Sequence, residues 1–277
     1  MEFSLTTLII GQNTNLTQAL LAKLQGSHAL SSRKLSENIE LLAPYTDQSI
    51  NLIFNNFQTA TQLNDSEHIA SYIENSIHIT AKVLEYFNKT PIAKIIYTSS
   101  SSVYGNNIFC DEQDEVKPLN LHASLKVSNE KLIERYAENR QIDYTIARIF
   151  NMFGGNDTFS IINKILTAYT KNEPLTIINN GNAIRDFIHI DSVVNVYQRL
   201  LTTPNIPIIN IGSGRGTSIR NVLDFLKNHQ IELQTQNLSR DELKISTANN
   251  AIMVELLDHN TTIDVENYLL ERLKRTP

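Results

Sequence analysis

The stretch TTLIIGQNTNLTQALLAKL, residues 6–24, indicates the class of fold. It begins with a short aliphatic and β-branched run, passes through a polar turn at Gly11, and continues with leucines at helical spacing. This order predicts a buried strand, a turn and a helix. In such a unit a dinucleotide pyrophosphate binds at the turn, against the amino end of the helix.

The same alternation continues along the chain. Apolar runs at 51–54, 93–99, 143–150 and 207–212 indicate further buried strands, and segments with helical spacing separate them. Strands that alternate with helices of this length imply right-handed crossovers and a mostly parallel sheet covered on both faces. The sequence therefore predicts an α/β fold, a Rossmann-like doubly wound parallel sheet with a smaller C-terminal substrate-binding lobe.

The alternation loosens beyond about residue 155, which suggests where the lobe begins. We expect residues 1–155 to form the dinucleotide-binding core, with 186–212 contributing to it. Residues 156–277 should form mainly the substrate-binding lobe, interleaved with the core.

Composition narrows the functional classes. The 277 residues are 41% hydrophobic and 19% charged with a net charge of −5, so no basic patch indicates nucleic acid or an anionic membrane. No apolar run approaches the roughly 20 residues that span a bilayer, and the N-terminus has no signal-peptide pattern. The one cysteine, Cys110, excludes an internal disulfide and a thiolate cluster for zinc. We therefore expect a reduced, cytoplasmic protein without a metal site.

The glycines of the first turn are incomplete. Gly11 stands where the first glycine of a dinucleotide turn belongs, but positions 14 and 17 are both threonine. Thr14 could offer a hydroxyl, and the helix amino end still attracts an anion. An ordinary strand–helix turn remains the alternative.

The end of the second predicted strand reads HALSSRKL, residues 28–35. A carboxylate there would bind the ribose 2′-hydroxyl of NAD. Ser31, Ser32, Arg33 and Lys34 stand in its place, and hydroxyls with cations suit a 2′-phosphate. NADP is therefore favoured over NAD, unless this segment is a solvated basic loop.

Five ordered segments carry a family resemblance. They are IIYTSSSSVYGNN at 95–107, LHASLKVSNEKLIERY at 121–136, YTIARIFNMFGG at 144–155, GNAIRDFIHIDSVV at 181–194 and INIGSGRGTSI at 209–219. In this order and spacing the chain resembles the extended short-chain dehydrogenase/reductase family, specifically its nucleotide-sugar epimerases, dehydratases and ketoreductases. The resemblance covers essentially the whole chain.

The resemblance implies a catalytic site with one exchange. By the family's pattern, Ser100 hydrogen-bonds the reacting oxygen, and Lys126 holds the nicotinamide ribose. His122 stands where the family has its proton-carrying tyrosine. An imidazole can carry a proton near neutral pH, but a neighbouring lysine cation disfavours its charged form. A working proton carrier and lost chemistry both remain open.

The resemblance also implies binding residues. The cofactor would contact Gly11, Thr14, Leu16, Ser32, Arg33, Asn55, Asn75 and Lys126, and the substrate would contact Tyr104, Asn151 and Arg185. Arg185 would clamp the diphosphate of a sugar nucleotide, a task for its forked donors. The alternatives are buried structural amides for Asn55 and Asn75, and a surface ion pair with Asp186 for Arg185.

Two functions follow from these expectations. The first is an NAD(P)-dependent ketoreductase or epimerase acting on a nucleotide-linked sugar or deoxysugar, which would suit the synthesis of surface-polysaccharide precursors. The second is a catalytically impaired family member that acts as a binding or regulatory protein. The family resemblance also implies a homodimer.

Overall fold

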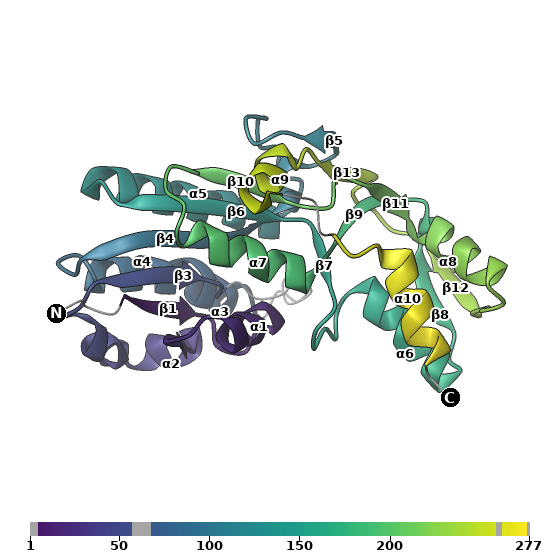
Figure 1. Ribbon diagram of the computed structural model, residues 1–277, viewed down its shortest axis with the longest axis horizontal. Coiled ribbons are helices and arrows are strands. Elements are labelled where there is room, and N and C mark those ends of the chain that lie inside the picture. Colours follow the sequence, from purple (N-terminus) through teal and green to yellow (C-terminus); the bar gives the residue numbers. More distant parts are fainter. Residues whose placement is uncertain (1–4, 57–67, 259–261, 276–277) are drawn as a thin grey trace. The chain divides into compact units, whose positions relative to one another are not determined.

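The structure is a computed structural model that describes residues 5–56, 68–258 and 262–275. The start of the chain, where the sequence predicts no signal peptide, lies outside these residues. Two compact units make up the chain, and Figure 1 shows their elements. Unit 1 comprises Met1–Val103, Pro118–Arg148 and Tyr197–Ile209, and unit 2 comprises Tyr104–Lys117, Ile149–Val196 and Asn210–Pro277. Compactness does not reveal what each unit binds, so the division into core and substrate lobe stays a prediction.

Unit 1 is built on a six-stranded sheet with the order β10-β6-β4-β3-β1-β2. Its strands are β1 (Thr6–Ile10), β2 (Ser27–Leu30), β3 (Ile50–Phe54), β4 (Ile92–Ser100), β6 (Asp143–Ile149) and β10 (Ile208–Ile211). β1 pairs in parallel with both β2 and β3, and β3 pairs in parallel with β4. The predicted Rossmann-like parallel sheet is confirmed. The five strands predicted from apolar runs are five of these six, and the sixth, β2, ends where the sequence predicts the end of a second strand.

Helices flank this sheet. They are α1 (Asn15–Lys23), α2 (Ser32–Glu37), η1 (Ile39–Tyr45), α3 (Ile69–Ile73), η4 (Glu74–His78), α4 (Ile79–Tyr86) and α5 (Leu121–Arg140). Figure 1 shows α1 on the near face of the sheet and α4 and α5 on the far face. The apolar cluster between sheet and helices includes Leu8, Leu52, Phe54, Val83 and Ile133, all fully buried. This burial explains why continuous apolar runs mark these strands.

Unit 2 contains a five-stranded sheet in which β7, β9, β11, β13 and β5 take part, and a two-stranded parallel pair of β8 and β12. Their bounds are β5 (Asn107–Cys110), β7 (Asn151–Phe153), β8 (Leu175–Ile178), β9 (Ile184–His189), β11 (Gly216–Ser218), β12 (Thr235–Leu238) and β13 (Ile245–Ala248). Its helices are α6 (Ile161–Lys171), η6 (Asn179–Gly181), α8 (Ile219–Asn228), α9 (Ala251–Leu257) and α10 (Val265–Lys274).

Two further helices, η5 (Ser101–Tyr104) and α7 (Ile190–Leu200), contain the boundary between the units. Unit 2 has its own apolar cluster, with Phe153, Ile165, Val222 and Leu269 at its centre. In the part of the chain that the structure describes, no helix combines the length and the apolar composition that crossing a bilayer requires.

Candidate functional site

The carboxyl ends of β1 and β3 form the switch point of the unit 1 sheet. β2 and β3 lie on opposite sides of β1, so the connections that leave β1 and β2 diverge there. Ligands of open α/β sheets bind in the crevice at such a point. Gly11 follows β1, and its amide donates to the carbonyl of Leu30 at the end of β2 over 2.8 Å. Asn55 follows β3, and its amide donates to Ile10 over 2.8 Å.

Gly11 is needed at this turn for two reasons. Its φ of +116° lies in a region that side chains rarely adopt, and a Cβ there would stand 2.1 Å from the carbonyl oxygen of Asn55. The glycine therefore allows the turn to pack directly on the end of β3.

The two threonines of the turn form a polar network with Asn55. Thr14 caps α1, because its hydroxyl accepts the amide of Thr17 over 3.0 Å. The Thr17 hydroxyl donates to the carbonyl of Gly11 over 2.7 Å. The Asn55 amide donates to the hydroxyls of Thr14 and Thr17 over 2.6 and 2.8 Å. The turn, which has threonines where two further glycines are expected, is thus stabilised by side-chain hydrogen bonds.

Polar atoms that could form hydrogen bonds with a dinucleotide lie beside this turn. Asn75 belongs to η4, a single π-helical turn of the kind often found at functional sites. Asn56 donates to the Asn75 carbonyl over 2.9 Å. Among the described residues, the Oδ1 atoms of Asn56 and Asn75 are buried without a hydrogen-bond partner, and such atoms call for a water or a ligand. With Gly11 and the helix end, these residues fit a dinucleotide.

The residues predicted to select NADP lie at the end of β2, next to Gly11. Ser32 is the first residue of α2, and Ser31 precedes it as the N-cap without a side-chain capping bond. Arg33 is 85% exposed and stands 3.6 Å from Glu37 in a surface ion pair. Leu16 is buried on the core side of α1.

Helix α5 carries His122 and Lys126 on one face. Asn120 caps the amino end of the helix, because its side chain accepts the amide of Ala123 over 2.9 Å. Lys126 is only 5% exposed, and its Nζ donates to the Thr98 carbonyl over 2.7 Å. That carbonyl lies two residues before Ser100 on β4. Lys126 thus joins α5 to the strand that carries the predicted catalytic serine.

Burial lowers the pKa values of two side chains of α5, His122 and Lys126. Burial, and then the charge of Lys126, lower the pKa of His122 to about 4. Burial lowers the pKa of Lys126 to about 7, against an opposing effect of Glu130. His122 also stands edge-on to Tyr72, with 6.4 Å between ring centroids. The imidazole is therefore neutral at pH 7 and a weak proton donor.

Ser100 is half-buried, and its Oγ accepts the amide of Ser102 over 3.2 Å. The neighbouring Ser99 donates to Glu130 from within the core. Glu130 forms a buried ion pair with Arg148 over 2.8 Å. Glu130 also lies one helical turn after Lys126. The buried ion pair of Glu130 and Arg148 is thus hydrogen-bonded to the end of β4 through Ser99.

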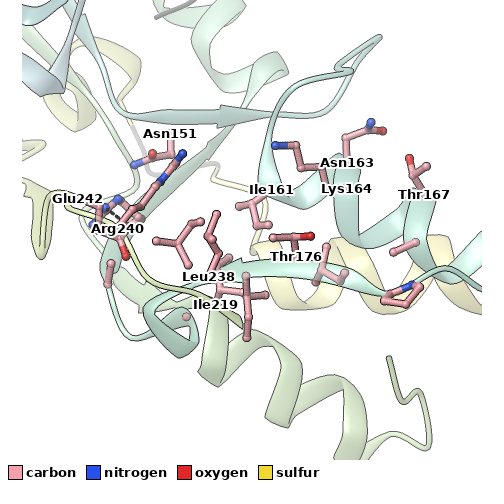
Figure 2. A pocket seen from close by; sticks show the side chains of 18 of the residues that line it. Asn151, Ile161, Asn163, Lys164, Thr167, Thr176, Ile219, Leu238, Arg240 and Glu242 are labelled. Atoms are coloured by element: carbon pink, nitrogen blue, oxygen red, sulfur yellow. Dashed lines mark hydrogen bonds and ion pairs between the residues drawn. The ribbon is translucent and has the colours of Figure 1, made fainter. Parts of the chain in front are cut away.

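Unit 2 holds a cavity of about 700 Å³ that Asn151 and Arg185 both line. Its walls come from β7, α6, β8, β9 and the segment after β12, as Figure 2 shows. Ile161, Ile177, Ile219 and Leu238 give it an apolar side, and Thr176 and Asn163 add polar groups. This mixture of an apolar wall with a few polar groups is typical of small-molecule sites.

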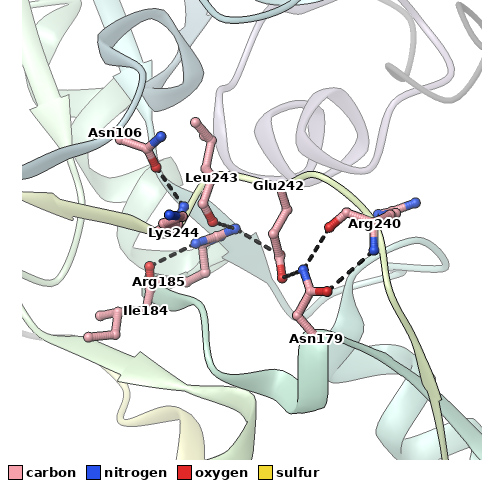
Figure 3. A network of polar contacts seen from close by, with 8 residues as sticks. All are labelled: Asn106, Asn179, Ile184, Arg185, Arg240, Glu242, Leu243 and Lys244. Atoms are coloured by element: carbon pink, nitrogen blue, oxygen red, sulfur yellow. Dashed lines mark hydrogen bonds and ion pairs between the residues drawn. The ribbon is translucent and has the colours of Figure 1, made fainter.

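Arg185 lies in a polar network at one side of this cavity (Figure 3). Its guanidinium donates to Glu242 over 3.1 Å, to the Ile184 carbonyl over 2.9 Å, and to the Leu243 carbonyl. The alternative of an ion pair with Asp186 is wrong. Asp186 is fully buried and accepts the amides of Ser213, Gly214 and Ala248.

The structure does not place Tyr104 in this cavity. Tyr104 is 1% exposed, and its hydroxyl donates to Asn210 over 2.8 Å within unit 2. Sequence reasoning also missed residues that line the cavity, namely Lys164, Arg240 and Glu242. Charged residues outside any motif give no signal in a single sequence.

Comparisons with known proteins agree with this architecture. A model of the NAD dependent epimerase/dehydratase family matches residues 11–212. Protein CapI of Staphylococcus aureus is 29% identical over 179 residues, which cover 63% of this chain and 53% of that protein. UDP-glucuronate 4-epimerase of Thermodesulfobacterium geofontis is 26% identical over 213 residues, 74% of this chain and 64% of that protein. The matched stretches thus span about half to two thirds of these relatives.

Solved structures share the whole fold. UDP-glucuronic acid 4-epimerase from Bacillus cereus, in complex with UDP-glucuronic acid and NAD, superposes with a TM-score of 0.83 at 21% identity. The match covers 98% of this chain and 98% of that one.

Proposed function

Because the chain belongs to the NAD dependent epimerase/dehydratase family, we propose that it is an NAD(P)-dependent ketoreductase or epimerase of a nucleotide-linked sugar. The observation that carries this proposal is the 700 Å³ cavity of unit 2, lined by Asn151 and Arg185. Its volume lies in the range of sites for small organic ligands, about 300–1,000 Å³. Relatives named as UDP-sugar epimerases support the substrate class.

The chain's own residues would share the work as follows. NAD(P), when bound, supplies the hydride acceptor or donor. Gly11, Asn55 and Asn75 would hold it at the switch point, with Lys126 on its ribose. Ser100 would donate a hydrogen bond to the reacting sugar oxygen. His122 would take the hydroxyl proton in the oxidation direction and return it in the reduction direction.

Calorimetric titration with NADPH, NADH, UDP-glucose and UDP-glucuronate tests the proposal. We expect saturable binding of one dinucleotide and one nucleotide sugar, and conversion of that sugar detected by chromatography. If no nucleotide sugar binds at millimolar concentration, the proposal is refuted.

The second candidate is a binding or regulatory protein, and two observations favour it. The His122 pKa of about 4 leaves little acid at neutral pH. Thr14, Thr17 and Asn55 fill the turn with their mutual hydrogen bonds. Nucleotide-sugar binding without conversion, in the presence of either dinucleotide, would establish this candidate and exclude the enzyme.

Assembly and location complete the proposal. We infer a homodimer in the cytoplasm, on the family resemblance and the single cysteine. Light scattering on the purified protein would test for the dimer, because a monomer would have a mass near 31.4 kDa. Cell fractionation would test the location.

A further inference from the structure

The two sides of the switch point in unit 1 differ in their number of strands. In doubly wound sheets that bind dinucleotides, three strands commonly lie on the side of the adenosine half and three on the side of the nicotinamide half. Here β1 and β2 form the first side, and β3, β4, β6 and β10 form the second. Residues 31–49, which connect β2 to β3 and are all described, form α2 and η1 and no strand. The adenosine side is therefore one strand shorter than usual.

The strand that ends this side, β2, lies at an open edge. It has four residues and, among the described strands, pairs only with β1. His28 is exposed and the other three residues are half-buried, whereas all five residues of β3 are buried. Helix α2 follows β2 with six residues, of which only Leu35 is buried. A ligand group bound at this edge would therefore stay largely in contact with water.

The polar groups of the adenosine side are exposed as well. Arg33 is 85% exposed, and its ion pair with Glu37 spans 3.6 Å. Lys34 is exposed and Ser32 is half-buried. Contacts between exposed charges are weak and are screened by salt. Such groups can select a 2′-phosphate, but they add little to the total affinity for a dinucleotide.

The first turn uses several of its own donors internally. The amide of Gly11 donates to the carbonyl of Leu30, and the amide of Thr17 donates to the hydroxyl of Thr14. The hydroxyl of Thr17 donates to the carbonyl of Gly11. A pyrophosphate would therefore depend on the remaining amides at the amino end of α1. This leaves fewer contacts for the pyrophosphate and for the adenosine half that follows it.

The nicotinamide side has buried and fixed polar groups. Asn55, Asn56 and Lys126 are 8%, 4% and 5% exposed. The Asn56 side chain donates to the carbonyl of Asn75, and the ammonium of Lys126 donates to the carbonyl of Thr98. Groups that are already held in place lose little freedom when a ligand binds, so they contribute more to affinity than mobile ones. The two halves of a dinucleotide should therefore contribute unequally to binding.

We propose that the protein holds NAD(P) mainly by its nicotinamide half and releases it after each turnover, so that it acts as an NADPH-consuming reductase and not as an epimerase. This inference rests on the proposed function, because it selects between the two reactions named there. An epimerase returns to the sugar the hydride that it removed, so its cofactor is regenerated in place. A reductase uses one NADPH per sugar. The hydride forms a C–H bond at the keto carbon, a proton completes the hydroxyl, and the site must then release NADP⁺.

Fragments of the cofactor measure the contribution of each half. The parent protein is titrated with NADH, with reduced nicotinamide mononucleotide, which lacks the adenosine half, and with 5′-AMP, which lacks the nicotinamide half. We expect the mononucleotide to bind within about tenfold of NADH, and a larger difference would overturn the inference. Saturable binding of 5′-AMP at millimolar concentration would overturn it as well, because the adenosine half would then have a site of its own.

Variants and salt test the two sides separately. Lys126→Met should weaken NADPH, NADH and the mononucleotide by a common factor, since all three carry the nicotinamide ribose. Arg33→Met should weaken NADPH alone, and Lys23→Met, which removes an exposed cation from the last turn of α1, is the matched control. The preference for NADPH over NADH should vanish near 1 M salt, where the Debye length is about 3 Å. A preference that persists there would reveal a buried 2′-phosphate site and overturn the inference.

Release of the cofactor is tested by gel filtration of the protein loaded with NADPH. We expect the eluted protein to carry no absorbance of reduced nicotinamide. Reduction of a 4-keto nucleotide sugar should consume one NADPH for each hydroxyl formed. Protein that keeps a full complement of cofactor through the column would overturn the inference.

The parent protein separates failure of this inference from failure of the proposed function. If it converts a nucleotide sugar while it retains its cofactor, the proposed function stands as an epimerase and the inference alone falls. If it binds a nucleotide sugar but no nicotinamide compound, the inference falls together with the enzyme, and the binding protein remains. If it binds no nucleotide sugar, the proposed function falls and the inference falls with it.

Discussion

The ammonium of Lys126 donates a 2.7 Å hydrogen bond to the carbonyl of Thr98, which ties α5 to the strand that ends at Ser100. The contact places a cation with a pKa near 7 beneath the end of the central strand. Its charge therefore changes in the pH range in which such a protein would work. Near neutral pH, the charge of the candidate site therefore changes at Lys126 and not at His122, whose pKa is about 4.

NADPH binding should weaken as the pH rises through about 7. Lys126 has a pKa lowered to about 7, chiefly by burial, so above this pH the ammonium becomes a neutral amine. The loss of charge removes its attraction for the cofactor's ribose and phosphates. Calorimetry between about pH 6 and pH 9 measures this. Lys126→Met should bind weakly at every pH, and a parent affinity that does not change across the range would contradict the assignment.

His122→Tyr should increase turnover of a 4-keto nucleotide sugar at pH 7. Since the pKa of His122 is about 4, roughly one molecule in a thousand carries the histidinium acid at that pH. In the parent, turnover that depends on this acid should fall as the pH rises from about 4. His122→Phe is the matched control without a proton carrier. Equal rates for the tyrosine and phenylalanine variants would show that position 122 carries no proton.

NADPH should bind more tightly than NADH, because cations and hydroxyls follow β2 where a carboxylate would favour NAD. Replacing Arg33 and Lys34 together by alanine should weaken NADPH and leave NADH unchanged. Both dinucleotides are titrated at one fixed salt concentration. An equal loss of affinity for NADPH and NADH would show that the ribose binds elsewhere.

Thr14→Ala should reduce the free energy of unfolding by about 1–2 kcal/mol. The substitution removes the cap of α1 and leaves an Asn55 donor without one of its acceptors. Urea denaturation measures the loss. Thr46→Ala, which removes an exposed hydroxyl at the end of η1, should change stability by less than about 0.5 kcal/mol. Similar losses of unfolding free energy for both variants would mean that the hydrogen-bond network of Thr14 contributes nothing to stability.

Glu130→Gln should destabilise unit 1 by about 3–5 kcal/mol, because it leaves the buried Arg148 without its carboxylate. Replacing both members, as in Glu130→Met with Arg148→Met, should cost much less, since no uncompensated charge remains. Thermal and chemical denaturation of Glu130→Met, Arg148→Met and the variant that carries both forms a double-mutant cycle. Additive losses would show that the two charges do not interact.

Continuous apolar runs made the central strands predictable. β1, β3 and β4 are almost entirely buried, so aliphatic and aromatic residues dominate their sequences. β2 has no continuous apolar run, because its four residues SHAL are only partly buried at the edge of the sheet, and the sequence indicated only where this strand ends. The short strands of unit 2 were missed for a related reason. β7 and β11 have three residues each, too few to establish a period.

The candidate site was likewise predictable only where local sequence motifs exist. Gly11, Asn55 and Lys126 follow motifs. The structure places the first two at the sheet's switch point and the third on α5, from which its ammonium donates to a carbonyl of β4. The partner of Arg185 could not be predicted, because Glu242 lies 57 residues further along the chain. No local pattern records a contact that only tertiary folding creates.

The strand order of unit 1 has a consequence for synthesis. β6 and β10 are neighbours in the sheet, and the amide of Ile146 donates to the carbonyl of Pro207, the residue before β10. The stretch from α6 to β9, which belongs to unit 2, nevertheless lies between the two strands in the chain. On the ribosome, β6 must wait for β10 with one edge unpaired, and open edges recruit other strands. The nascent chain therefore carries this unpaired edge in the interval between the emergence of residues 149 and 211.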